Sequence, residues 1–209
     1  MRSSLLMFFL LISVCVVRSQ DLIQEKFNNA YALSQQKNYR QALAEYKSII
    51  DQIPAHSPAR LQASWCYLIL GEVAESARQA DLAVMMDPFY QAVYSMKAYV
   101  SYAQGDPKAE QFLRLAIWMS SDDSILQYFQ KDYDDLVEAG VQPQVFRALK
   151  NKTAKLFDER NKSFGPVITD ISKGQQLLAE GNGGGAVSAF QNAIRMALFP
   201  SEFSHFRPL

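Results

Sequence analysis

The chain has 209 residues, and its 21 basic and 21 acidic side chains give a formal net charge of zero. A neutral balance argues against binding of nucleic acids or anionic membranes through the charge of the chain as a whole. The two cysteines cannot form a disulfide framework, and the two histidines cannot build a His-rich metal site. The hydrophobic share of 49% is that of an ordinary globular protein with a buried core.

The chain opens with an apolar run behind one basic residue. Arg2 precedes the run, which extends from Leu5 to Val17. A helix of this length spans roughly 20 Å, whereas a bilayer core is about 30 Å thick. Val17 and Ser19 form the small-x-small pattern of a cleavage site. The pattern predicts that residues 1–19 are a cleaved signal peptide and that the protein is exported, to the periplasm or outside the cell.

Two alternatives remain open for this segment. It could stay uncleaved and anchor the protein in a membrane. It could also be a lipoprotein signal ending before Cys15, although Val14 stands where such signals usually carry Gly or Ala. After cleavage the chain would have 19 basic and 21 acidic side chains, a formal charge of −2, and no expected membrane span. Its one thiol, Cys66, lies among apolar residues, which is typical of a core cysteine.

Residue types recur along the chain at a spacing of 34, which indicates an internal repeat. A small residue followed by an aromatic one recurs as Ala30-Tyr31, Ser64-Trp65 and Ala98-Tyr99. Lys37, Gly71 and Gly105 follow at the same spacing, where a segment ends. In the third unit Ala109 and Ala116 fall one residue early, so this unit lacks one residue in its second half.

Each unit is predicted to form two helices. Apolar residues recur at steps of three and four within Leu61–Leu70 and again within Glu75–Met86. Gly71 falls between these runs, where a helix end favours a left-handed residue. Pro88 follows the second run and ends that helix or begins the next. Small residues such as Ala98 let the two helices of a unit approach each other closely.

A further unit follows after a gap. Six of its residues repeat the spacings of the second unit: Gly174, Leu177, Gly181, Ala186, Phe190 and Ala193. We expect Gly165-Pro166 to open this unit. Residues 122–165 do not follow the repeat, and we expect irregular helices packed on the repeats, one beginning near Ile125 and ending at Gly140, another beginning at Pro143.

In these repeated residues the chain resembles the tetratricopeptide repeat family. The matching residues are Ala30, Leu33, Tyr39, Ala42, Tyr46, Pro54, Ser64, Tyr67, Gly71, Ala80, Ala83, Pro88, Ala98, Gly105, Ala109 and Ala116. The resemblance implies an all-α fold, an α-α superhelix of helix pairs, whose concave face binds proteins or peptides. The expected organisation is a signal peptide (1–19), three repeats (23–121), an inserted irregular helical segment (122–165), a further repeat (166–200) and a tail (201–209).

Motifs for catalysis or cofactor binding are missing from the sequence. The Gly181–Gly185 run lacks the Lys-Ser/Thr pair of a phosphate loop. The acidic segment Asp132–Asp135 lacks the later ligand and Gly of a calcium loop. Neither His56 nor His205 has a Cys, Asp or Glu at metal-ligand spacing. We therefore expect a protein that is not an enzyme, with no catalytic residues, no metal or other cofactor, and no small-molecule substrate.

The aromatic residues Tyr31, Trp65 and Tyr99 form a ladder, one on the first helix of each unit. In the family this position lines the concave groove. The candidate groove residues are Phe27, Tyr31, Leu61, Trp65, Leu68, Tyr99 and Tyr102. Large rigid aromatic side chains are common anchors for protein partners. The sequence thus favours an interaction module that binds a protein or peptide segment in an aromatic groove.

A covered groove is the alternative. Residues 122–165 or the tail could lie in it, and the protein would then be a structural subunit of a cell-envelope assembly. Some relatives grip a carboxylate with Lys, Asn and Arg on the groove face. The matching positions here are Phe27, Tyr31, Gln62, Ala92 and Met96, which cannot make such a charged clamp.

Overall fold

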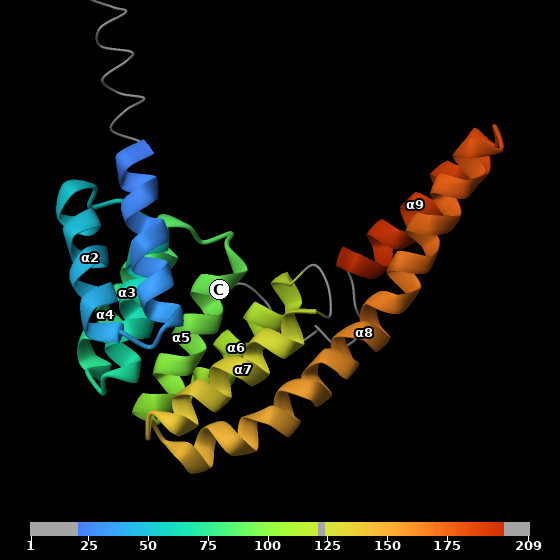
Figure 1. Ribbon diagram of the computed structural model, residues 1–209. Helices are drawn as coiled ribbons and strands as arrows, with labels where there is room; N and C mark the ends of the chain where they lie inside the picture. The colour runs from blue at the N-terminus through green and yellow to red at the C-terminus, as the bar shows by residue number, and fades with distance from the viewer. Residues whose placement is uncertain (1–20, 121–123, 199–209) are drawn as a thin grey trace, which may run out of the picture. The chain divides into compact units, whose positions relative to one another are not determined.

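The computed structural model describes residues 21–120 and 124–198, and these residues form helices with no strand among them (Figure 1). The expected signal peptide (1–19) and the expected tail (201–209) lie outside the described residues. The chain divides into two compact units, residues 1–150 and residues 151–209. The all-α class predicted from the sequence is therefore confirmed, and each unit is described by itself below.

The first unit is a series of helices that pack in neighbouring pairs. An N-terminal helix over residues 21–35 is followed by α2 (Tyr39–Gln52), α3 (Ser57–Ile69), α4 (Val73–Met86), α5 (Gln91–Gln104), α6 (Ala109–Met119), α7 (Ile125–Glu138) and the start of α8 (Pro143–Ala179). Helix α3 packs on α4 and α5 on α6, while α2–α3 and α4–α5 contacts join successive pairs. Helix α6 has 11 residues and α4 has 14, in line with the expected shortening of the third unit.

Small residues lie where the two helices of a pair approach each other. Ala30 and Ala98 have no exposed surface. In the second pair, Ser64 Oγ donates to the Ser76 carbonyl at 2.8 Å, and Ser76 Oγ donates to the Ser64 carbonyl at the same distance. Because both hydroxyls are satisfied, two buried polar residues stand at this contact without an unpaired group.

The connections between paired helices share one backbone conformation. Each has a left-handed residue after its first helix, namely Lys37, Gly71, Gly105, Gly140 and Gly181, with φ between 61° and 81°, and the α7–α8 connection has a second positive φ, of 39°, at Gln142. At Gly71 the amide donates to the Leu68 carbonyl at 3.0 Å, and the next amide, of Glu72, donates to the Tyr67 carbonyl at 2.9 Å. This is the Schellman geometry that satisfies the last carbonyls of a helix.

The α7–α8 pair continues the series more closely than the sequence indicated. Gly140 follows Gly105 by 35 residues and has φ 78°, so its turn is equivalent to the others. Seven residues before each turn residue stands the small residue, but seven before Gly140 stands Tyr133. Its ring packs 5.9 Å from the ring of Phe146 on α8. An aromatic side chain in the small position is the reason that residues 122–165 did not appear to follow the repeat.

The second unit contains most of α8 and the paired helix α9 (Gly183–Leu198). Gly165 and Pro166 do not open a unit, because α8 runs through them. The helix tolerates the missing proline amide, and the Thr169 hydroxyl donates to the Gly165 carbonyl at 2.9 Å. At Gly174 an added Cβ would lie 2.5 Å from the Phe190 ring, which shows how closely α9 approaches α8.

We predict that Ala98→Leu destabilises the protein by about 1–3 kcal/mol, because three added carbons overpack the contact between α5 and its neighbours. Urea unfolding measures the change. The control is Gln104→Leu at the exposed end of the same helix, which should change stability by less than about 0.5 kcal/mol. Equal effects of the two substitutions would contradict the close approach at Ala98.

Candidate binding cleft

Helix α7 packs against the aromatic residue of the third repeat. The Tyr99 ring lies 6.0 Å from the Phe129 ring and 5.7 Å from the Tyr133 ring, both edge to face, and 6.4 Å from the ring of Phe146. These are favourable aromatic geometries. Tyr99 is consequently only 3% exposed. The chain therefore covers one end of its own aromatic ladder.

The other end of α7 reaches the first repeat. The Lys37 ammonium, in the turn before α2, lies 2.7 and 2.6 Å from the two carboxylate oxygens of Glu138. These residues are separated by 101 positions in sequence. Helix α7 thus contacts Tyr99 of the third repeat and also the turn that joins the helix over residues 21–35 to α2 (Figure 1).

A cleft remains between α7 and the first helices of the repeats. It has a volume of about 470 Å³, which lies in the range of typical ligand pockets. Its walls come from the helix over residues 21–35, from α3 and α5, and from α7 on the opposite side. The aromatic side chains in the lining are Tyr31, Tyr39, Trp65, Tyr90, Tyr99, Tyr128 and Phe129.

Four of the candidate groove residues line this cleft: Tyr31, Leu61, Trp65 and Tyr99. Exposure falls along the ladder, because Tyr31 is 46% exposed, Trp65 is partly buried and Tyr99 is 3% exposed. The Trp65 and Tyr99 rings meet edge to face with centroids 6.2 Å apart. The structure therefore brings the three ladder residues together on one surface, open at the Tyr31 end.

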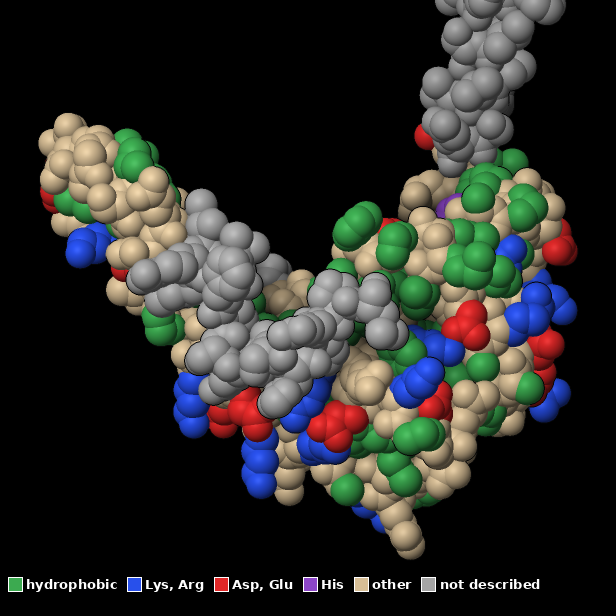
Figure 2. Space-filling model, turned by 180° about the vertical axis from the view of Figure 1, so that it is seen from behind, with side chains coloured by type: hydrophobic (Ala, Val, Ile, Leu, Met, Phe, Trp, Pro, Cys, Tyr) green, Lys and Arg blue, Asp and Glu red, His purple; other side chains and the backbone are tan. Residues whose placement is uncertain are grey.

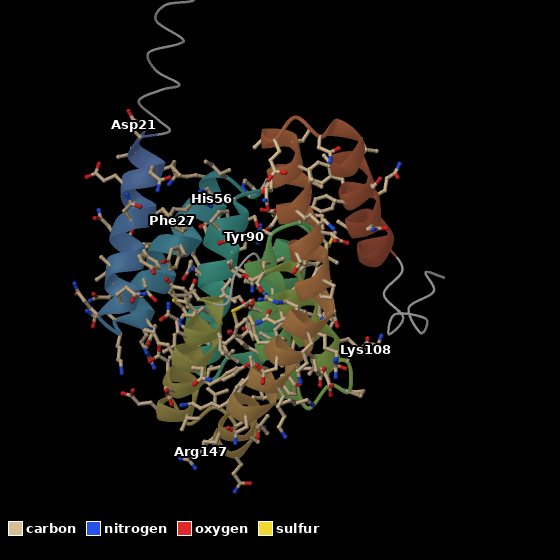
Figure 3. All side chains as sticks on the ribbon, turned by 90° about the vertical axis from the view of Figure 1, so that its right-hand side faces the viewer. Asp21, Phe27, His56, Tyr90, Lys108 and Arg147 are labelled. Carbon is tan, nitrogen blue, oxygen red and sulfur yellow. The ribbon has the colours of Figure 1, made fainter. Side chains whose placement is uncertain are left out.

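The other three candidates lie outside the cleft lining. Phe27 packs between helices, with its ring 5.6 Å from Tyr46 and 5.7 Å from His56 (Figure 3). Leu68 is completely buried in the core. The Tyr102 hydroxyl is near Glu110 of α6, and burial raises its pKa to about 12. These side chains hold the repeats together.

A partly buried carboxylate lies inside the cleft. The Tyr99 hydroxyl donates to Asp132 Oδ2 at 2.9 Å. Burial raises the pKa of Asp132 to about 6, against the lowering effects of this hydrogen bond and of Lys131. Burial and the neighbouring carboxylate also raise the pKa of Tyr99. Asp132 is therefore a carboxylate held next to the aromatic side chains of the cleft.

Sequence reasoning missed Asp132, Tyr90 and Tyr128 as cleft residues, since it tested the acidic segment only as a calcium loop. One signal was available, because Gly140 follows Gly105 by 35 residues, which indicates that α7 belongs to a further helix pair. It does not show which side chains of α7 face the cleft.

The described residues offer little for chemistry. Among them, no group of His, Cys, Asp and Glu is arranged to hold a metal ion. The Cys66 thiol has no exposed surface, and burial raises its pKa to about 12, which disfavours the reactive thiolate. In the part of the chain that the structure describes, we find no helix with the length and hydropathy needed to span a membrane.

We predict that Asp132→Asn stabilises the protein at pH 8. The folded-state pKa of Asp132 is about 6, against an ordinary value of 3.8, so folding favours the protonated carboxyl. This contribution is present below about pH 4 and is lost as the pH rises through 6. Asp132→Asn should exceed the native protein in stability by about 1–3 kcal/mol at pH 8, with a difference that shrinks toward pH 5. Urea unfolding across this range tests it, and a difference that does not vary with pH would contradict it.

Comparison with known proteins agrees with the helix pairs. Residues 33–100, about a third of the chain, match a tetratricopeptide repeat model. No curated protein matches the chain. Domains of this family typically bind protein partners and are generally non-catalytic. The matched segment contains α2, α3, α4 and the first ten residues of α5. This match, together with the paired helices, supports a tetratricopeptide repeat protein.

Proposed function

We propose that the protein is an exported, non-catalytic interaction module that binds a short segment of a protein partner in the cleft beside α7. The observation that carries the proposal is the exposed aromatic surface of the cleft. Tyr31, Tyr90 and Tyr128 line it and are 46%, 46% and 59% exposed. They come from three different elements, and their remaining exposed surface is available to a partner.

The form of the cleft favours a short segment of chain. Partly exposed aromatic side chains that surround a concave surface are common anchor points for protein partners. Helix α7 occupies the surface around Tyr99, so a partner has access chiefly from the Tyr31 end. An extended peptide running over all three ladder residues would first have to displace α7.

Export is part of the proposal and rests on residues 1–19. Their basic residue, apolar run and small-x-small pattern are typical of signal peptides. The non-catalytic role is supported by the inert environment of Cys66. It is further supported by the family to which the repeats belong.

A structural role is the second candidate, and one surface outside the cleft favours it. Met85 is 78% exposed and Phe89 is 90% exposed at the connection between α4 and α5. Hydrophobic side chains gather at several places on the surface of the first unit (Figure 2). We call Met85 and Phe89 the docking corner. A subunit of an envelope assembly could bind its neighbours through this corner, without any partner in the cleft.

We predict that peptides selected by the purified protein from a random displayed library lose binding to the variant Tyr31→Ala/Tyr128→Ala. Both side chains are about half exposed and lie outside the core, so the variant should fold normally. Loss of two aromatic anchors should weaken binding at least about tenfold. Fluorescence anisotropy with labelled selected peptides measures it.

The control for this experiment is Phe89→Ala, which removes an even more exposed ring outside the cleft. Its affinity for the selected peptides should match that of the native protein. If Phe89→Ala loses binding while the double variant keeps it, the docking corner is the functional surface and the cleft proposal is wrong. Thermal melts of all three proteins show whether folding is equal.

A further inference from the structure

Two lysines and two aspartates line the cleft, but one of these aspartates has no lysine of its own. Two cations lie in the lining, Lys37 and Lys131. Lys37 is held by Glu138, and Lys131 Nζ lies 2.9 Å from Asp135 Oδ2. Each ammonium therefore has its own carboxylate. Asp132 is left over, and within the described residues its hydrogen-bond partner is the neutral Tyr99 hydroxyl.

An anionic ligand would find poor complementarity here. It would have to take Lys37 or Lys131 from its present carboxylate, and it would approach the negative charge of Asp132. A cation meets the opposite situation, since it would supply a charged partner for the partly buried Asp132 carboxylate. Charge-assisted hydrogen bonds of this type are the stronger ones.

The aromatic side chains around Asp132 also favour a cation. The Trp65 and Tyr99 rings meet edge to face beside it, and Phe129 and Tyr128 belong to the same lining. The faces of aromatic rings carry negative potential and attract ammonium and guanidinium groups. Aromatic rings also pack on the aliphatic part of a Lys or Arg side chain.

We propose that the cleft recognises a positively charged side chain, Lys or Arg, on the partner segment, with Asp132 as its ion-pair partner and Trp65 as an aromatic wall. The inference rests on the proposed function and makes it more specific. The partner is then a basic segment of a protein, and the cleft binds one cationic side chain of that segment.

Binding of this kind depends on pH. The groups that face or neighbour Asp132 are Tyr99 from α5, Lys131 and Asp135 from α7, and, next to these two, Tyr39 from α2. Asp132 must be ionised to pair with the ligand, and its pKa in the free protein is about 6. Affinity should therefore be full at pH 8 and fall as the pH drops through 6.

The experiment uses two peptides that differ in charge alone, acetyl-Ala-Ala-Arg-Ala-Ala-amide and its citrulline counterpart. Citrulline keeps the shape of arginine and lacks its charge. The protein contains two tryptophans, Trp65 in the cleft and Trp118 outside its lining. Their indole N–H signals in ¹⁵N-labelled protein, assigned with Trp65→Phe, report binding and provide an internal control.

We expect the arginine peptide to shift the Trp65 signal in a saturable manner at pH 8, at concentrations up to about 10 mM, while Trp118 stays unchanged. The citrulline peptide should bind at least about tenfold more weakly. With Asp132→Asn, which we expect to be the more stable protein, the two peptides should behave alike. Equal binding of both peptides to the native protein, or no arginine-dependent shift, overturns the inference.

Failure of this inference is distinct from failure of the proposed function. If library peptides depend on Tyr31 and Tyr128 but carry no Lys or Arg and bind equally at pH 8 and pH 5, the cleft binds a partner of another chemistry. The proposed function then stands without the cation. If the library peptides do not depend on these tyrosines, the proposed function fails, and the charge inference falls with it.

Discussion

The structure of the first unit depends on the packing of α7 against Tyr99. This contact buries the third residue of the aromatic ladder and places the C-terminal end of α7 at the first turn, where Glu138 pairs with Lys37. It also converts an open face of repeat helices into a cleft with a wall on each side. The position of the partly buried Asp132 carboxylate is a consequence, because α7 brings it within hydrogen-bond distance of the Tyr99 hydroxyl. The proposed binding of a cationic side chain follows from that position.

The repeats themselves could be predicted from the sequence, because their signals are local. The small residues Ala30, Ser64 and Ala98 are all buried, as close helix approach requires. Gly71 and Gly105 occupy left-handed turns, which glycine adopts without strain. The spacing of 34 residues was sufficient to predict both the small residues and the turn glycines. The start of α7 at Ile125 and of α8 at Pro143 was likewise predicted, from a polar stretch and a proline.

The rest depends on contacts between distant residues, which no local pattern records. Phe27 and Trp65 are both aromatic residues on first helices, yet Phe27 packs into the core beside His56 while Trp65 lines the cleft. The α7–α8 pair was not recognised as a repeat from the sequence, because Tyr133 occupies a position that holds a small residue in the other pairs. Pro166 marked an expected boundary, yet α8 continues through it. The position of Asp132 in the cleft depends on its contact with Tyr99 of α5. The spacing of residues along the sequence does not identify that contact.

The most direct test of this account is carbodiimide cross-linking of the purified protein, followed by mass spectrometry. The reagent joins an ammonium to a carboxylate with no spacer, and the Lys37 and Glu138 side chains are 53% and 66% exposed. The pairs Lys97–Asp81 and Lys150–Asp134 serve as positive controls, and mixed ¹⁴N and ¹⁵N protein separates links within one chain from links between chains. We predict an amide between Lys37 and Glu138 of the same chain. Its absence while the control pairs react would mean that α7 does not reach the first repeat, and the cleft described above would not exist.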